Sequence, residues 1–207
     1  MAAYGRPSLR DLFDESPTPH IAHPPRTHHR DFYVATDGSL RDDGGGLGVV
    51  IETRDGERVD RLSLDHTVSD NNVAEYRALH LGLDVLADRT PSDARVGVLV
   101  DHDQLASNVN AAVLDACRST APSPHQLVIP PATTHHWRGI RARINGFDEI
   151  RAARIASADN PAHPLANAPG EYGHVNDGPD RCIRPDPISS SDRPIPPPSR
   201  SDRGASD

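Results

Sequence analysis

Lysine is absent from this sequence: all 22 basic residues among the 207 are arginine. Aspartate outnumbers glutamate by 24 to 6, and the formal net charge is −8. We expect a halophilic protein from this composition, because carboxylates keep their hydration at high salt. A GC-rich genome, which replaces lysine by arginine, explains the same composition. Neither explanation determines the fold.

Cysteine and long apolar runs are scarce too. Cys117 and Cys182 have no Cys-x-x-Cys spacing, which argues against a disulfide framework or a cysteine zinc site. The histidines of the N-terminal segment form no complete zinc ligand set. No apolar run approaches the roughly 18 residues of a membrane span, and the N-terminus shows no signal-peptide pattern. We therefore expect a cytoplasmic, monomeric protein without membrane contact.

Regular apolar patterns are confined to residues 30–160, which we interpret as one domain. Residues 1–29 are rich in proline and histidine and predict an irregular N-terminal extension. Within that extension, Leu9–Phe13 is a short amphipathic piece that could dock on the domain.

Residues 161–207 form a second segment of biased composition, rich in Pro, Ser, Asp and Arg. Such a segment cannot bury enough apolar surface to offset the entropy lost on ordering. We predict that residues 178–207 are disordered and that residues 161–177 lie extended on the domain surface.

The domain begins with patterns of three hairpin-linked strands. Phe32–Thr36 is an apolar, β-prone run, and Gly44–Gly46 predicts a turn before a second strand over Leu47–Thr53. The hairpin signal Arg54–Gly56 then leads to a third strand over residues 59–64.

Helical and strand patterns alternate in the rest of the domain. Apolar residues recur at helical spacing from Tyr76 to Leu86, with Ser69 or Asp70 as the N-cap. The further elements are a strand over Val96–Val100, a helix over Leu105–Ala116, a fifth strand over Trp137–Ile144, a turn at Asn145-Gly146 and a last helix over Phe147–Ala156. The order β-β-β-α-β-α-β-α predicts an α/β fold with a mixed five-stranded sheet flanked by helices.

Isolated carboxylates stand near the ends of three of these elements. Asp37 ends the first strand, Glu75 lies one turn into the first helix, and Asp101 ends the fourth strand. Alone, each has an ordinary structural explanation as a turn residue, a partner of the helix dipole or a helix cap. Together they indicate a site of converging carboxylates, which hydrolysis of a phosphodiester by two divalent ions requires.

The motifs around these residues resemble those of the type 1 ribonuclease H family, including its haloarchaeal members. The similarity covers roughly residues 30–158, and its most specific part is the run from Asn71 to Tyr76. The resemblance implies a ribonuclease H-like fold and hydrolysis of the RNA strand of RNA–DNA hybrids. It also implies two Mg²⁺ or Mn²⁺ ions, held by four catalytic carboxylates: Asp37, Glu75, Asp101 and Asp148.

Two of these assignments leave alternatives. The family pattern has Leu three residues after the third carboxylate, whereas Leu105 follows Asp101 by four, so Asp103 competes for the role. We prefer Asp101 because it ends the alternation of valines. For the fourth carboxylate we prefer Asp148 over Glu149.

The loop before the last predicted helix is another departure. Many family members carry a mobile histidine there, associated with proton transfer or product release. Here that loop is shortened to Asn145-Gly146, and His135 and His136 precede the predicted fifth strand instead. Surface or nucleic-acid contacts suit these histidines better than the family role.

The resemblance further implies substrate contacts. Asn71 and Asn72 match positions that touch the minor groove of a hybrid, where the 2′-OH distinguishes RNA from DNA, although helix capping explains them equally. Gly38 and Ser39 keep bulk away from a metal and are assigned to substrate binding. Phosphate contacts are expected from an arginine-rich stretch, unless it is simply a solvated face: Arg138, Arg141 and Arg143.

Two other functions remain open. The altered surroundings of Asp101 and the shortened loop suggest a noncatalytic nucleic-acid-binding module with the same fold. Another nuclease of the superfamily, acting on DNA, is the other alternative, and the Asn71-Asn72 pair argues against it.

Overall fold

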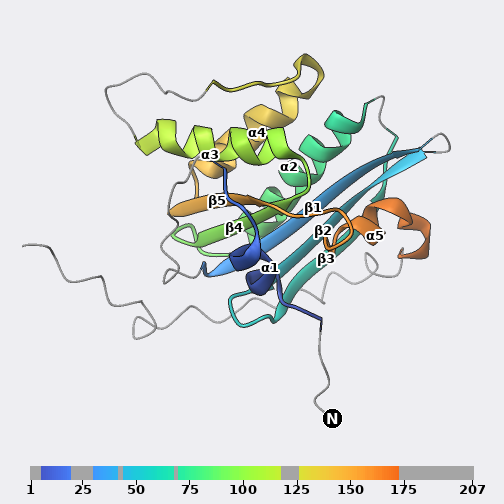
Figure 1. The fold of residues 1–207 in the computed structure, drawn as a ribbon, viewed down its shortest axis with the longest axis horizontal. Helices are drawn as coiled ribbons and strands as arrows, with labels where there is room; N and C mark the ends of the chain where they lie inside the picture. Colours follow the sequence, from blue (N-terminus) through green and yellow to red (C-terminus); the bar gives the residue numbers. More distant parts are fainter. Residues whose placement is uncertain (1–5, 20–29, 42–43, 68–69, 118–125, 173–207) are drawn as a thin grey trace, which may run out of the picture.

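A mixed five-stranded sheet forms the centre of the protein (Figure 1). The computed structural model describes residues 6–19, 30–41, 44–67, 70–117 and 126–172. The strand order is β3-β2-β1-β4-β5, with β1 to β3 antiparallel and β4 and β5 parallel to β1. The strands are β1 (Phe32–Arg41), β2 (Gly44–Thr53), β3 (Arg58–Asp65), β4 (Arg95–Val100) and β5 (Glu149–Arg154). The predicted fold class is confirmed.

Helices cover both faces of this sheet, α2, α3 and α4 on one face and α1 and α5 on the other (Figure 1). The helices are α1 (Leu9–Glu15), α2 (Asn71–Arg89), α3 (Asp103–Cys117), α4 (Thr134–Ile144) and α5 (His163–Asn167), with short 3₁₀ turns at Pro131–Thr133 and Pro169–Glu171. Among the residues that the structure describes, no helix has the length and apolar character needed to cross a membrane.

Two apolar cores form because successive residues of a strand point to opposite faces. Val34 faces the core beneath α2, α3 and α4, whereas its neighbours Tyr33 and Ala35 face the core beneath α1 and α5. The predicted stripe of α2 is fully buried in the first core. Asp70 is the N-cap of this helix, since its Oδ1 accepts a hydrogen bond from the amide of Asn72 at 2.7 Å.

The last third of the domain differs from the prediction. Trp137–Ile144, predicted as a strand, lies within helix α4, and the predicted helix Phe147–Ala156 contains strand β5. Trp137, Ile140 and Ile144 are spaced three and four residues apart, so one face of a helix buries all three. This face packs against α2, where the Trp137 ring lies edge-on to Tyr76.

The first hairpin is longer than predicted. β1 continues to Arg41, and β2 begins at Gly44, so the predicted Gly44–Gly46 turn is part of a strand. Gly46 pairs with Ser39 and Gly45 with Leu40 in the antiparallel register. The two strands therefore extend past the end of β4, and helix α5 packs on this extension.

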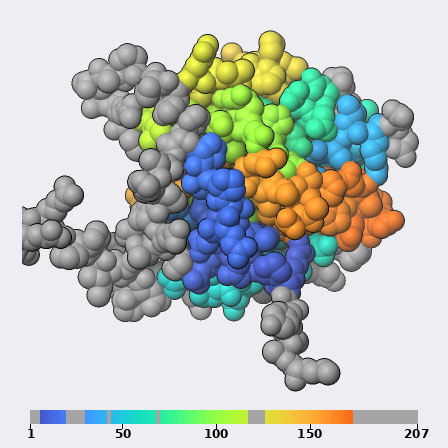
Figure 2. Space-filling model, in the orientation of Figure 1, coloured from blue at the N-terminus to red at the C-terminus, as the bar shows by residue number. Residues whose placement is uncertain are grey.

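Both terminal segments contribute to the second core. Figure 2 shows the N-terminal segment, in blue, and the C-terminal segment, in orange, side by side on one face of the molecule. Leu9 and Phe13 of α1 are buried, and the Phe13 ring packs edge-on against Tyr33 at 5.5 Å, so the amphipathic piece docks as anticipated. The sequence predicts an extended surface segment over residues 161–177. The structure differs for residues 161–172, because Leu165 and Ala166 are fully buried within α5. The packed region thus continues past residue 160. The predicted disorder of residues 178–207 lies outside the described residues.

Candidate metal centre

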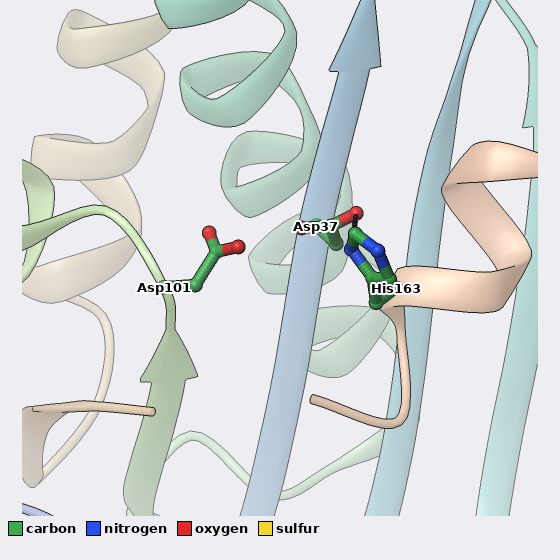
Figure 3. A group of neighbouring side chains, drawn as sticks. All are labelled: Asp37, Asp101 and His163. Carbon is green, nitrogen blue, oxygen red and sulfur yellow. Dashed lines mark ion pairs between the residues drawn. The ribbon is translucent and has the colours of Figure 1, made fainter. Parts of the chain in front are cut away.

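Asp37 and Asp101 lie beside each other at the end of two parallel strands. β1 pairs with β4 as far as Ala35 opposite Leu99. Continuing that register by two residues places Asp37 opposite Asp101, which directly follows β4. Figure 3 shows Asp101 directed toward Asp37 from the end of β4. The carboxyl end of a parallel strand is where open α/β sheets bind their ligands.

Glu75 reaches the same place because helix α2 crosses β1 at close range. A Cβ atom on Gly38 would lie only 2.2 Å from the backbone carbon of Ala74, so only glycine allows this approach. The amide of Gly38 donates a hydrogen bond to Oε2 of Glu75 at 3.3 Å. Gly38 therefore brings the Glu75 carboxyl next to Asp37, and both carboxyls are buried.

His163, the first residue of α5, completes the group. Its Nδ1 lies 3.3 Å from Oδ2 of Asp37. Figure 3 shows the His163 ring beside the Asp37 carboxyl. Asp37, Asp101 and His163 each offer one ligand atom, and these atoms all lie within 4.8 Å of one another. Within the described ranges they are the single set of three or more such side chains close enough to share a metal ion.

Helix α5 is held in place by contacts with β1, β2 and β3. The hydroxyls of Ser39 and Ser63 donate hydrogen bonds of 2.6 Å to the carbonyls of Ala166 and Leu165, respectively. A Cβ on Gly48 would lie 2.2 Å from the carbonyl oxygen of Ala162, so the helix start rests directly on the strand. These contacts give Ser39 a role in positioning His163, and substrate contact by Gly38 or Ser39 stays a prediction.

Two further hydrogen bonds fix the chain between β5 and α5. The side-chain amide of Asn160 donates to the carbonyl of Thr36 at 2.9 Å, directly before Asp37. The hydroxyl of Ser157 donates to Oδ2 of Asp101 at 2.7 Å. This connection therefore orients Asp101 and carries the chain back to β1, where His163 follows.

Burial raises the pKa of both enclosed carboxyls. The pKa of Asp37 rises from 3.8 to about 8, first through burial and then through the charge and hydrogen bond of Asp101. The pKa of Glu75 rises from 4.5 to about 9, again first through burial and then through the charges of Asp101 and Asp37. The bond from Gly38 opposes the shift of Glu75. The site thus gathers more carboxyl groups than its own donors can keep ionised, and a bound cation would stabilise their charged forms.

A divalent cation fits the donors that are present. Oδ2 of Asp37 is buried and has no hydrogen-bond partner, an arrangement that costs free energy unless a cation or donor binds it. Ligand atoms about 2.1 Å from one ion lie about 3–4 Å apart, a range that includes the 3.3 Å between Asp37 and His163. The three side chains can therefore coordinate one ion without rearrangement of the backbone.

The structure does not bring Asp148 into this group. Its amide donates to the carbonyl of Ala94, directly before β4, so Asp148 lies at the start of that strand and Asp101 at its end. The six residues of β4 separate them by about 20 Å. Its alternative, Glu149, lies at the same end and pairs with Arg30 at 2.7 Å. His163 occupies the place that we expected a fourth carboxylate to take.

The competition between Asp101 and Asp103 has a structural answer. Asp103 is the first residue of α3, its side chain is 76% exposed, and it forms a 2.5 Å ion pair with Arg154. His102 precedes it as a local cap, with Nδ1 accepting from the amide of Leu105 at 3.1 Å. Of the two aspartates, only Asp101 belongs to the group of side chains close enough to share a metal ion.

The two asparagines predicted to touch substrate differ in their surroundings. Asn71 is exposed at the first position of α2, one turn before Glu75. Asn72 is half-buried, and its Oδ1 lies 2.9 Å from Nε2 of His102. Since Nδ1 of His102 accepts a hydrogen bond, Nε2 carries the proton and donates to Asn72.

The predicted arginines and the two adjacent histidines all lie on α4 or directly at its start. Arg138 and Arg141 are exposed, whereas Arg143 forms a 2.6 Å ion pair with Asp84 of α2. The rings of His135 and His136 pack on His80 of α2, with centroids 6.4 and 5.8 Å away. These histidines belong to the contact between α2 and α4, on the face of the sheet opposite α5.

Sequence reasoning missed His163 because it assigned the segment to a surface tail. A signal was present: Ala162, Leu165 and Ala166 follow the spacing of one helical face, and all three are buried. The neighbouring prolines hid this short pattern.

These elements and their order define a ribonuclease H-like fold, as the resemblance implied. No protein-family model and no curated protein sequence matches the chain. Solved structures do match it. The ribonuclease H1 LC11, isolated from compost by a metagenomic approach, has a TM-score of 0.54 at 22% identity, over 66% of this chain and 93% of that chain.

Two further structures show the same similarity. Ribonuclease H1 from the halophilic archaeon Halobacterium salinarum NRC-1 has a TM-score of 0.52 at 22% identity, over 68% of this chain and 97% of that chain. The N-terminal ribonuclease H domain of rv2228c from Mycobacterium tuberculosis has a TM-score of 0.51 at 22% identity, over 65% and 95%. LC11 has also been solved in complex with an RNA/DNA hybrid, and that structure has a TM-score of 0.51.

Proposed function

We propose that this protein is a metal-dependent endonuclease that hydrolyses the RNA strand of RNA–DNA hybrids. The observation that carries the proposal is the convergence of Asp37, Glu75 and Asp101 around a buried carboxylate oxygen without a hydrogen-bond partner. The ribonuclease H-like fold supports the choice of substrate, since LC11 with the same fold has been solved with an RNA/DNA hybrid.

The chain's own residues supply the ligands and the charge for this chemistry. Two bound Mg²⁺ or Mn²⁺ ions would activate water and stabilise the leaving 3′ oxygen, so no side-chain nucleophile is required. Asp37 and Glu75, whose pKa values are raised, release protons when a cation binds. Ser157 orients Asp101, and the Gly38 amide orients Glu75.

The surroundings of the site provide candidate substrate contacts. Asn71 is our choice for reading the 2′-OH of the RNA strand, because it is exposed one turn before Glu75. The side chain of Asn72 is engaged by His102 and Asp70, so it would support this contact from behind. Arg138 and Arg141, exposed on α4, are proposed to bind phosphates, with Arg143 tied to Asp84.

Cleavage of end-labelled RNA–DNA hybrid, in Mg²⁺ or Mn²⁺ and at low and molar KCl, tests the proposal. We expect cuts in the RNA strand only, leaving 5′-phosphates, and complete inhibition by EDTA. Hybrid binding without cleavage under every condition would instead identify a noncatalytic module. Cleavage of duplex or single-stranded DNA with the hybrid left intact would identify a different nuclease of the superfamily.

A further inference from the structure

Contacts of both the backbone and the ring position His163. Its backbone belongs to a helix whose start rests on Gly48 and whose carbonyls bind Ser39 and Ser63. Both nitrogens of its ring lie 3.1 Å from Nδ2 of Asn167, which is one turn later in the helix. The contacts on both sides hold Nδ1 toward the buried carboxyl of Asp37.

The nitrogen faces a buried carboxyl oxygen that lacks a hydrogen-bond donor. Oδ2 of Asp37 makes no hydrogen bond, and its 3.3 Å separation from Nδ1 suits two adjacent ligands of one ion. The Asp37 side chain is 3% exposed, whereas that of His163 is 44% exposed. An ion could therefore enter from the His163 side and meet a buried carboxylate.

We propose that His163 binds the catalytic metal through Nδ1, and that the mixed oxygen and nitrogen ligand set makes this centre prefer Mn²⁺ to Mg²⁺. Mg²⁺ is a hard ion that favours oxygen ligands and gains little from an imidazole. Mn²⁺ accepts carboxylates as Mg²⁺ does. As a transition-metal ion it is less hard than Mg²⁺ and gains more from an imidazole nitrogen. The inference concerns the same centre as the proposed function, but it is tested by metal binding alone.

A competing arrangement would use the same geometry without any metal. A protonated His163 would pair with Asp37 and serve as the internal cation of the site. Coordination requires the opposite state, because an imidazole binds a metal only through an unprotonated nitrogen. Direct measurement of bound Mn²⁺ therefore separates the two arrangements.

The experiment uses the full chain, stripped of metal and free of nucleic acid. Mn²⁺ and Mg²⁺ are titrated separately by calorimetry, and bound Mn²⁺ is examined by pulsed electron paramagnetic resonance for coupling to a ¹⁴N nucleus. The variant is His163→Asp, which offers oxygen in place of nitrogen. The control is His135→Gln, since His135 is exposed and lies by His80 and His136 at α4, on the other face of the sheet.

We expect the wild type and His135→Gln to bind Mn²⁺ more tightly than Mg²⁺ and to show ¹⁴N coupling. His163→Asp should lose the coupling, and its preference for Mn²⁺ should fall at least about tenfold, or about 1.4 kcal/mol. Equal affinities in the wild type, coupling that persists in His163→Asp, or no Mn²⁺ binding would overturn the proposal. Mn²⁺ binding that depends on His163, together with an uncut hybrid, would refute the nuclease function and leave this inference standing.

Discussion

The side chain of Asn110 forms two hydrogen bonds with the backbone of Ala152, as a neighbouring strand would. Its Nδ2 donates to the Ala152 carbonyl at 2.7 Å, and its Oδ1 accepts from the Ala152 amide at 2.8 Å. β5 is an edge strand, so these groups have no strand partner on that side. Helix α3 thus supplies through one amide the pairing that an additional strand would give.

Replacing Asn110 by leucine should destabilise the fold markedly. Both Ala152 groups would be buried without partners, and each such group costs about 1–3 kcal/mol. We expect Asn110→Leu to lower the free energy of unfolding by about 2–4 kcal/mol in urea denaturation. The control is Asn145→Ala at an exposed position, which should change it by less than about 0.5 kcal/mol. An equally small loss in Asn110→Leu would show that water forms the hydrogen bonds to the amide and carbonyl of Ala152 instead.

Gly38→Ala should disrupt the metal centre as well as the fold. The added methyl group would meet the backbone of Ala74 and push α2, with Glu75, away from Asp37. We expect a loss of about 1–3 kcal/mol in stability and a loss of at least tenfold in Mn²⁺ affinity. Gly170→Ala is the matched control, because a Cβ there meets nothing within 4 Å. Unchanged Mn²⁺ affinity in Gly38→Ala would show that Glu75 takes no part in metal binding.

Asp37→Asn should raise stability in EDTA and change its dependence on pH. The folded-state pKa of Asp37, about 8, exceeds the unfolded value of 3.8, so the folded protein binds more protons between those limits. Stability contributed by this group is therefore present below about pH 4 and is lost as pH rises toward 8. Thermal melts at pH 5 and pH 8 should show a smaller decrease for Asp37→Asn than for the wild type.

The same substitution should remove nearly all hybrid cleavage, because it deletes a charged metal ligand. Glu75→Gln should behave alike in both assays, as its pKa is raised to about 9. Retention of more than about a tenth of the wild-type rate, equivalent to about 1.4 kcal/mol in the barrier, would refute the ligand assignment. In metal-free buffer, each 1 kcal/mol gained in the free energy of unfolding should raise the melting temperature by about 2–4 °C.

Asp101→Asn and Asp103→Asn should have different effects, because we propose Asp101 as a metal ligand whereas Asp103 only begins helix α3. Asp101 belongs to the metal-ligating group, so its substitution should abolish metal-dependent cleavage and weaken Mn²⁺ binding. Asp103 is exposed and paired with Arg154, so its substitution should cost at most about 1 kcal/mol of stability and leave cleavage intact. An inactive Asp103→Asn beside an active Asp101→Asn would reverse the assignment.

Local patterns predicted the type and order of the elements in the first two thirds of the domain, although not the full length of the first hairpin. Strict alternation in Val96–Val100 and helical spacing in Tyr76–Leu86 predicted β4 and α2, because each period buries one face. The register of the valines also favoured Asp101 over Asp103 as the site residue. The spacing of Trp137, Ile140 and Ile144 contained an equally local helix signal, which a strand interpretation of this short run overlooked.

The fourth member of the site depends on contacts that no local pattern contains. His163 is placed by hydrogen bonds such as that from Ser39 to Ala166, which join residues 127 positions apart. β5 was similarly obscured, since Arg151 and Arg154 gave it a polar, helix-like composition while its partners came from α3 and β4. Long-range pairing of this kind leaves little trace in a short window of sequence.

The docking of α5 on the β1–β2 hairpin has a consequence for synthesis on the ribosome. Asp37, Glu75 and Asp101 leave the exit tunnel before α5, and their carboxyl groups can come together once β4 pairs with β1. His163 follows 62 residues after Asp101, so a nascent chain stalled before it would hold mutually repelling carboxylates with an incomplete ligand set. Premature termination upstream of α5 would therefore release a sheet without His163, the nitrogen ligand that we propose for this centre.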